Sequence, residues 1–327
     1  MPIQLLAQEE DKASTFPLDN FYAKIKKRPI SILRNVRFGL SAGYGSTSFN
    51  HKLDGFGIYQ AKGKQPLIFD SKNTKVNYTN WVNNVGIDTA KVKPGSFLVS
   101  SDSAKLGFNG SAFNIPFKAT IHYEWGGRYR IGAGYSYELM SIGKFHSTSY
   151  SDKISDFQPS GSSGWMSRYF GIVGVSFYRV GDYLFTGDLE VGKYNLGSNF
   201  NTAYVQAGVV YFNLGVSVER ELSEYLRLFV RPSYDVKSYT LNLPEGGKSI
   251  SYGINALYIN VGVSYRIPDL PKCFIPDCKI QMNHAHGDHE YRSRVHPFYK
   301  KQNPQYGQNH PNLIKYKGRN KKKLNPY

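Results

Sequence analysis

The feature that most constrains this fold is an alternation of apolar and polar residues that recurs about eight times between Val36 and Arg266. A β-strand projects successive side chains to opposite faces. In the first segment, one face carries Val36, Phe38, Leu40, Ala42 and Tyr44, and the other carries Arg37, Gly39, Ser41, Gly43 and Gly45. A sheet of this kind needs apolar surroundings on its outside and a wet or ion-paired interior.

Eight segments carry this pattern and are predicted to be strands: 34–49, 112–125, 129–139, 168–179, 184–196, 203–220, 225–241 and 251–266. An even number of strands in chain order can close without leaving unpaired backbone amides in lipid. No run of eighteen apolar residues occurs, which excludes a helical span. We therefore predict an all-β fold, an eight-stranded antiparallel up-and-down transmembrane β-barrel. A lipocalin-like soluble barrel would reverse the polarity, and the inward-facing residues disfavour it.

The connections predict how the chain is organised. Those after the second, fourth and sixth strands are short, as at Gly126-Gly127, whereas residues 50–110 form a long loop rich in Tyr, Phe and Trp. Short turns are usual on the periplasmic rim and long loops outside. We therefore expect a barrel over 34–267 in the bacterial outer membrane, with both termini in the periplasm. The extracellular loop should extend the strands or fold over the barrel mouth.

Charged residues on the inward positions predict a filled lumen, because eight strands enclose only enough space for side chains. The basic members are Arg37, Lys118, Arg130, Arg227, Arg231 and Arg266, and the acidic members are Glu124, Glu138, Asp188, Glu190, Glu219 and Asp235. Buried charges persist when they are paired, so a general solute pore is not expected. His122 and Glu124 are assigned to this network. We assign no catalytic residue and predict no enzymatic activity.

The segments flanking the barrel are predicted separately. Residues 1–7 resemble the end of a secretory signal, with an ordinary mobile N-terminus as the alternative, and 8–33 form a polar, basic periplasmic lead. The tail, 268–327, contains twelve Lys or Arg against four Asp or Glu, a net charge of +8 within a chain of net charge +17. In the long loop, Asp88-Thr89-Ala90 and Asp102-Ser103-Ala104 resemble a short O-glycosylation pattern that also occurs by chance.

The most specific chemical signal is a cluster of cysteine and histidine in the tail. The candidate ligands are Cys273, Cys278, His284, His286 and His289. Thiolate and imidazole groups suit a tetrahedral zinc site. The rival is a Cys273–Cys278 disulfide in an oxidising periplasm, which would remove both thiolates. The residues leave both alternatives open, so zinc is a possible but not required cofactor.

The rest of the tail interleaves aromatic residues with Lys, Arg, Asn and Pro, and has too little apolar content for a core of its own. We expect it to order against periplasmic protein partners, with Tyr299, Tyr306, Tyr316 and Tyr327 as the anchors. The alternative is a solvated basic tail on anionic lipid headgroups. Nucleic acid is not an expected partner of an exported barrel.

With eight strands followed by such a tail, the chain resembles small outer-membrane β-barrels of the OmpA-transmembrane or PorG-like type from Bacteroidota. The resemblance is architectural, covers residues 34–267, and includes no peptidoglycan-binding domain. It implies an accessory or scaffold subunit of an envelope machine, such as outer-membrane protein assembly or type IX secretion, with outer-membrane lipid and neighbouring protein subunits as partners. The alternatives are a metal-binding or sensing barrel, a small pore, and a lipid-modifying enzyme.

Overall fold

The computed structural model describes residues 35–70, 78–79, 84–85, 94–100, 105–158, 162–180, 182–197, 205–208, 210–222, 225–242, 249–268, 270–276, 278, 284–286 and 289–292. No helix in these ranges is both long and apolar enough to cross a bilayer. The predicted signal remnant, the N-terminal lead, both glycosylation-like triplets and the four tyrosine anchors of the tail lie outside the described residues.

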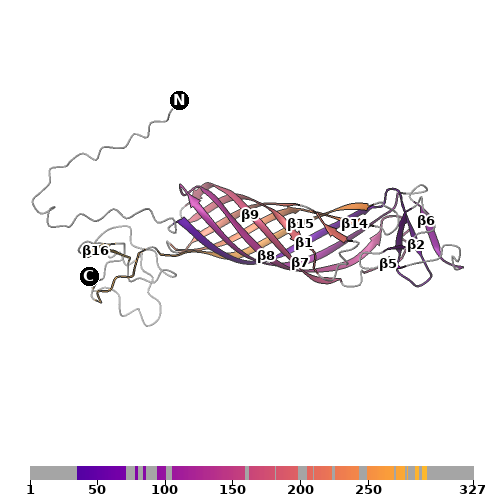
Figure 1. The fold of residues 1–327 in the computed structure, drawn as a ribbon, viewed down its shortest axis with the longest axis horizontal. Coiled ribbons are helices and arrows are strands. Elements are labelled where there is room, and N and C mark those ends of the chain that lie inside the picture. The colour runs from indigo at the N-terminus through magenta and orange to yellow at the C-terminus, as the bar shows by residue number, and fades with distance from the viewer. Residues whose placement is uncertain are drawn as a thin grey trace, which may run out of the picture. The chain divides into compact units, whose positions relative to one another are not determined.

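Eight long antiparallel strands form a ring in which neighbours in sequence are neighbours in space (Figure 1). They are β1 (Val36–Lys52), β7 (Gly107–Trp125), β8 (Tyr129–Ser147), β9 (Ser163–Val180), β10 (Tyr183–Asn195), β12 (Tyr211–Glu221), β13 (Leu226–Val236) and β15 (Ser249–Arg266). Because β1 pairs with both β7 and β15, every strand of the ring has two hydrogen-bonded neighbours. The predicted all-β, up-and-down architecture is confirmed.

Two short strands lengthen the sheet at one end of the ring. β14 (Ser238–Asn242) pairs with the first residues of β15, and β11 (Val205–Ala207) pairs with β14. The predicted strands 203–220 and 225–241 are therefore each divided in two. At the other end, Gly126 and Gly127 have φ of 60° and 63°, a backbone region that glycine adopts without steric cost, and they make the predicted tight turn between β7 and β8.

The outer surface of the ring carries a continuous apolar band. On β15, Leu257, Ile259, Val261 and Val263 point outward and are 38–61% exposed. The same outward rows on the other strands include Leu40, Phe117, Ile131, Val173, Leu189, Leu214 and Val230. Residues 257–265 at about 3.3 Å each and a tilt of about 40° span roughly 23 Å, close to the ~25 Å apolar band of transmembrane barrels. This half of the ring is built to face hydrocarbon.

The side-chain polarity inverts beyond this band. Further along β15, the outward residues are Ser249, Ser251, Gly253 and Asn255, while Ile250, Tyr252, Ile254 and Ala256 point inward and are buried. On β1 the outward residues become Ser46, Ser48, Asn50 and Lys52. The interior of this half is therefore apolar, unlike the ion-paired interior predicted at the level of the apolar band. The physical reason is that water surrounds it, so its apolar side chains pack inside.

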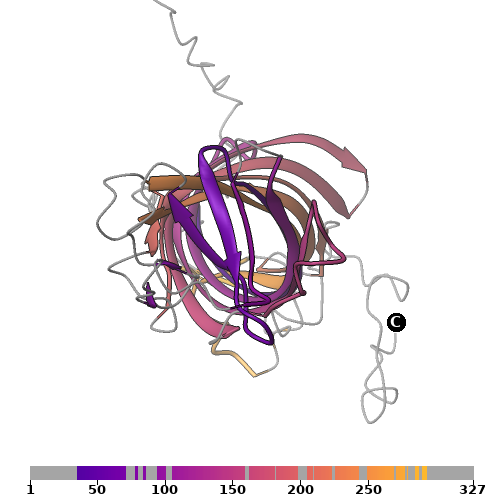
Figure 2. The same ribbon diagram turned by 90° about the vertical axis from the view of Figure 1, so that its right-hand side faces the viewer.

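The segment between β1 and β7 folds into a second sheet rather than an open loop. Its strands lie in the order β5-β4-β3-β2-β6, with bounds β2 (Phe56–Gln60), β3 (Leu67–Asp70), β4 (Tyr78–Thr79), β5 (Asn84–Val85) and β6 (Phe97–Ser100). Leu53, Ile58 and Val99 pack in one core with Phe108 and Phe145 of the ring. Figure 2, viewed along the ring, shows this sheet crossing the mouth. We call it the cap.

The chain separates into two compact units. Residues 35–222 and 226–266, the ring with its cap, form one of them. The described residues from 267 to 292 belong to the other, which contains a hairpin of β16 (His284–His286) and β17 (His289–Tyr291).

Candidate metal centre and sealed lumen

The interior of the ring, at the level of the apolar band, is filled by charged side chains that pair with one another. The structure buries Arg37, Lys118, Arg130, Arg227 and Arg231 of the predicted set, with all the predicted acidic residues except the half-buried Glu124. Arg266, at the end of β15, is also only half-buried. Two buried cations were missed, Arg168 and Lys237. Arg168 lies on an inward position of β9, within a segment predicted as a strand, and Lys237 lies between β13 and β14, at the break in the predicted strand 225–241. Both keep the inward phase of the alternation, so the alternation itself could have identified them.

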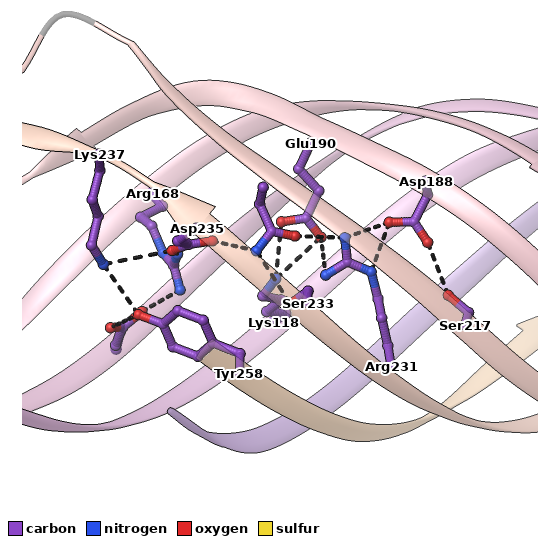
Figure 3. A network of polar contacts seen from close by, with 12 residues as sticks. Lys118, Arg168, Asp188, Glu190, Ser217, Arg231, Ser233, Asp235, Lys237 and Tyr258 are labelled. Carbon is purple, nitrogen blue, oxygen red and sulfur yellow. Dashed lines mark hydrogen bonds and ion pairs between the residues drawn. The ribbon is translucent and has the colours of Figure 1, made fainter. Parts of the chain in front are cut away.

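Arg168 is the centre of the first group of ion pairs (Figure 3). Its guanidinium binds Asp235 at 2.6 Å through Nη1 and Glu138 through Nη2, and its side chain is 1% exposed. Tyr258 donates to Glu138 at 2.6 Å and accepts from Lys237 at 3.1 Å. Charge-assisted hydrogen bonds between buried partners are among the strong ones.

A second group continues along the lumen through Arg231. Its Nε donates to Asp188 at 2.7 Å and its Nη1 lies 3.1 Å from Glu190, which also binds Lys118 at 2.9 Å (Figure 3). Gly215 lies beside this guanidinium, since a Cβ there would come within 2.6 Å of the Arg231 Cζ. The glycine therefore makes room for the arginine.

A third group lies toward the Gly126-Gly127 end. Glu124 accepts from Arg37 at 2.8 Å and from Arg227 at 2.7 Å, and its Oε1 lies 3.6 Å from His122 Nε2. Glu219 accepts from Arg130 at 2.6 Å. The carboxylate of Glu124 is thus held between two guanidinium groups, as an ion-pair role requires.

These groups leave little space for a solute. A cavity of about 50 Å³ remains beside Lys118, Arg130 and Glu190, which is room for only a few water molecules. The half of the ring beyond the apolar band, called the upper half below, is filled by the apolar core that it shares with the cap. The axis of the ring is therefore closed twice, by ion pairs at the level of the apolar band (the lower seal) and by this apolar core (the upper seal).

The upper seal contains a buried imidazole, beyond the apolar band on β1. His51 is 1% exposed, its ring centroid lies 5.2 Å from that of Phe145 and 4.1 Å from that of Tyr252, and its Nε2 lies 2.7 Å from the Tyr239 hydroxyl. Burial in this aromatic cluster lowers the pKa of His51 to about 3. The imidazole is therefore neutral at physiological pH.

In the second unit, backbone pairing brings the cysteine segment to the β16–β17 hairpin. Lys272 bridges to Arg292, Cys273 N donates to Arg292 O at 3.1 Å, and Arg292 N donates to Pro271 O at 2.9 Å. Cys278 N donates to Ile275 O at 3.3 Å, which turns the chain between the cysteines. His284 and His286 are two residues apart on β16, so both rings project to one face of the hairpin.

Four of the five predicted ligands converge. The ligand atoms of Cys273, Cys278, His284 and His286 all lie within 4.8 Å of one another. Sγ of Cys273 is 3.3 Å from Nε2 of His286, and Sγ of Cys278 is 3.1 Å from Nε2 of His284. The two Nε2 atoms are 3.1 Å apart. Cys273 and His284 are buried and Cys278 and His286 are half-buried, so the cluster is partly shielded from bulk water.

The fifth candidate, His289, is not part of this cluster. It pairs with His286 across the hairpin, but its side chain is exposed and is not among the four converging ligands. Among the described residues, neither cysteine is in a disulfide. The predicted cluster is therefore narrowed to two cysteines and two histidines.

No protein-family model matches this chain, and no curated protein matches it. Among solved structures, it is similar to the outer membrane protein OprG from Pseudomonas aeruginosa, with 8% identity over 71% of this chain and 96% of that chain and a TM-score of 0.37. It is also similar to the outer membrane protease OmpT from Escherichia coli, with 13% identity, 74% and 100% coverage and a TM-score of 0.33. The third similar structure is the β domain of the Bordetella autotransporter BrkA, with 9% identity over 71% of this chain and 99% of that chain and a TM-score of 0.25.

At these identities and TM-scores, the similarities carry no argument about this chain. The fold itself rests on the ring of eight antiparallel strands and on its outward apolar band, and it is that of an outer-membrane β-barrel.

Proposed function

We propose that this protein is a non-enzymatic outer-membrane β-barrel of Bacteroidota that acts as an accessory or scaffold subunit of a cell-envelope machine, either outer-membrane protein assembly or type IX secretion. In this proposal the apolar band lies in lipid, both termini lie in the periplasm, and the basic tail docks periplasmic partner subunits. β1 begins at residue 36 and β15 ends at residue 266, and both of these strand ends lie at the rim that carries the Gly126-Gly127 turn. Short turns are usual on the periplasmic rim, so this position supports the periplasmic placement of the two termini.

The observation that carries this proposal is the doubly sealed lumen. In the part of the chain that the structure describes, ion pairs close the axis in one half of the ring and an apolar core closes it in the other, which leaves no path for solutes. The contribution of the barrel is then its outer surfaces and its tail, which suits an anchor better than a channel. The low apolar content of the basic tail favours ordering on a partner.

Mild-detergent purification followed by mass spectrometry tests the scaffold role. We expect the full chain to recover subunits of an envelope machine, and a matched variant that ends at residue 267 to lose the periplasmic ones. Recovery of the barrel alone from the full chain would contradict the proposal. Equal recovery with and without the tail would contradict docking through the tail.

Planar-bilayer recording tests the seal, and the cap provides a sharp variant. Lys52 pairs with Gly107, and Leu53 N donates to Leu106 O at 3.1 Å, so an Asn-Gly turn in place of residues 54–105 would continue the β1–β7 hairpin. We expect no conductance from either form, because the ion pairs in the membrane-level lumen remain. Steady channels from the intact protein would favour the small-pore alternative.

A further inference from the structure

We propose that Cys273, Cys278, His284 and His286 form a closed structural zinc site that holds the first part of the C-terminal tail together. This inference concerns the second unit alone and stands independently of the scaffold role. It narrows the sequence-level alternatives to one ion and one ligand set, and it assigns His289 no part in the binding.

The distances match those of a tetrahedral ion's ligand shell. With Zn–N near 2.05 Å and Zn–S near 2.3 Å, tetrahedral geometry separates two ligand nitrogens by about 3.3 Å and a sulfur from a nitrogen by about 3.6 Å. The observed separations are 3.1 Å between the nitrogens and 3.1 and 3.3 Å between sulfur and nitrogen. These three separations are therefore within about 0.5 Å of those that a bound zinc ion requires, and no two of the four ligand atoms are more than 4.8 Å apart.

Hydrogen bonding explains this arrangement poorly. Nε2 of an imidazole carries either one hydrogen or one lone pair, and in each case it points in one direction in the plane of the ring. Each Nε2 can therefore make one good hydrogen bond. Here each Nε2 faces a sulfur and the other Nε2 at 3.1–3.3 Å. A cation at the centre accepts both lone pairs and both thiolates together, so all four contacts become favourable.

The size of the unit supports a structural role for the ion. β16 and β17 are three residues each, and a two-stranded hairpin is at best marginally stable in water without further support. Phe274 packs on Tyr291 with ring centroids 5.3 Å apart, but it is 66% exposed and so provides little core. Small units of this kind are commonly stabilised by a metal, and four protein ligands leave no open position for catalysis.

Thiolate and imidazole ligands select a borderline-soft ion rather than Mg²⁺ or Ca²⁺, which prefer oxygen. Zn²⁺ also carries no redox activity that would oxidise the adjacent thiols. Its binding would compete with disulfide formation, because each thiolate can serve only one of the two.

The experiment uses the full chain in detergent micelles, reduced and freed of metal, then titrated with Co²⁺ as a spectroscopic probe and back-titrated with Zn²⁺. We expect the visible bands of tetrahedral Co²⁺ and a thiolate-to-cobalt charge-transfer band, both lost when one equivalent of Zn²⁺ displaces the probe. Loss of an outer-shell partner alone weakens metal binding about 10–100-fold, so Cys278→Ser or His284→Ala should weaken it more than ~100-fold.

His289→Ala is the matched control, because it removes a neighbouring imidazole from the same hairpin and should leave the affinity unchanged. Heat-modifiable gel mobility reports in each variant that the barrel is still folded. The proposal is overturned if reduced protein gives no tetrahedral cobalt spectrum, or if His289→Ala weakens binding as much as His284→Ala. It is also overturned if protein from native envelopes, alkylated at lysis, carries a Cys273–Cys278 disulfide.

Discussion

Replacing Arg168 tests the ion-paired lumen most directly, because this side chain is 1% exposed and pairs with two carboxylates. In Arg168→Met, the side chain keeps much of its volume and loses its charge. Glu138 then keeps its hydrogen bonds from Tyr258 and Asn114, and Asp235 keeps its contact with Lys237 at 3.6 Å. Both carboxylates therefore stay buried without the positive charge of the guanidinium that balanced them.

Two independent estimates of the cost agree. Each charge-assisted hydrogen bond lost contributes about 1.5–3 kcal/mol, so two contribute roughly 3–6 kcal/mol. Removing one partner of a buried ion pair costs about 3–5 kcal/mol in general, because the remaining charge is left uncompensated. We therefore expect Arg168→Met to reduce the free energy of unfolding by about 3–5 kcal/mol, a large fraction of the 5–15 kcal/mol typical of folded domains.

The assay is reversible urea unfolding in lipid vesicles, followed by the fluorescence of the three tryptophans, of which Trp125 and Trp165 are exposed on the ring. The control is the double variant Arg168→Met, Glu138→Gln, which removes one cation and one carboxylate together and leaves Asp235 beside Lys237. It should recover part of the loss, because a neutral amide is far less costly to bury than an unpaired carboxylate. A loss below about 1 kcal/mol for Arg168→Met, or a double variant no more stable than the single one, would refute this account of the lumen.

Three further predictions follow from other parts of the molecule. Val261→Arg, on the outward face of β15 within the apolar band, should lower the free energy of unfolding by about 2–4 kcal/mol in the same assay. Ser251→Arg, on the same face beyond the band, should lower it by about 0–1 kcal/mol. Equal losses would show that the membrane boundary does not lie between these two residues. Histidine in the unfolded chain has a pKa near 6.5, whereas the pKa of folded His51 is about 3. Between these pH values only the unfolded state gains a proton. The free energy of unfolding is therefore highest above about pH 6.5 and falls by up to a few kcal/mol toward pH 3. His51→Phe should flatten that acid dependence of the denaturation midpoint, and an unchanged slope would contradict the assignment. Chelation of the proposed tail metal should leave the urea midpoint of the ring unaltered, because the ring and the metal cluster belong to different compact units. Urea titrations followed by circular dichroism, with and without chelator, measure this midpoint.

The architecture of the ring was predictable because period-2 alternation and turn residues act locally. The Gly126-Gly127 turn and eight strand segments follow from that signal alone. What was missed is where the polarity changes sign along a strand. Ile250, Tyr252 and Ile254 alternate with polar residues in the opposite phase to Leu257 and its row, so the inversion is recorded in the sequence of β15 as a change of phase. It was missed because the phase was read from the lipid-facing part of each strand alone.

The cap and the metal cluster were predictable to different degrees. The aromatic content of residues 50–110 indicated structure in the long loop, yet its strand order depends on contacts such as Ile58 with Val99 that are distant in sequence. In the tail, residue chemistry identified the cysteine and histidine candidates, but His289 lies opposite His286 across the hairpin, so neither spacing nor register excludes it. Only the folded positions of the side chains show that His289 is exposed and is not among the four converging groups.

The inversion of polarity along β1 and β15 has a mechanical consequence. Sliding the ring inward along its axis would draw Ser48 and Asn255 into hydrocarbon, and sliding it outward would expose Leu257 and its row to water. Both displacements are opposed, so the boundary between the two polarities fixes the depth of the ring in the bilayer. The half of the ring beyond the apolar band therefore stands at a constant height above the lipid surface.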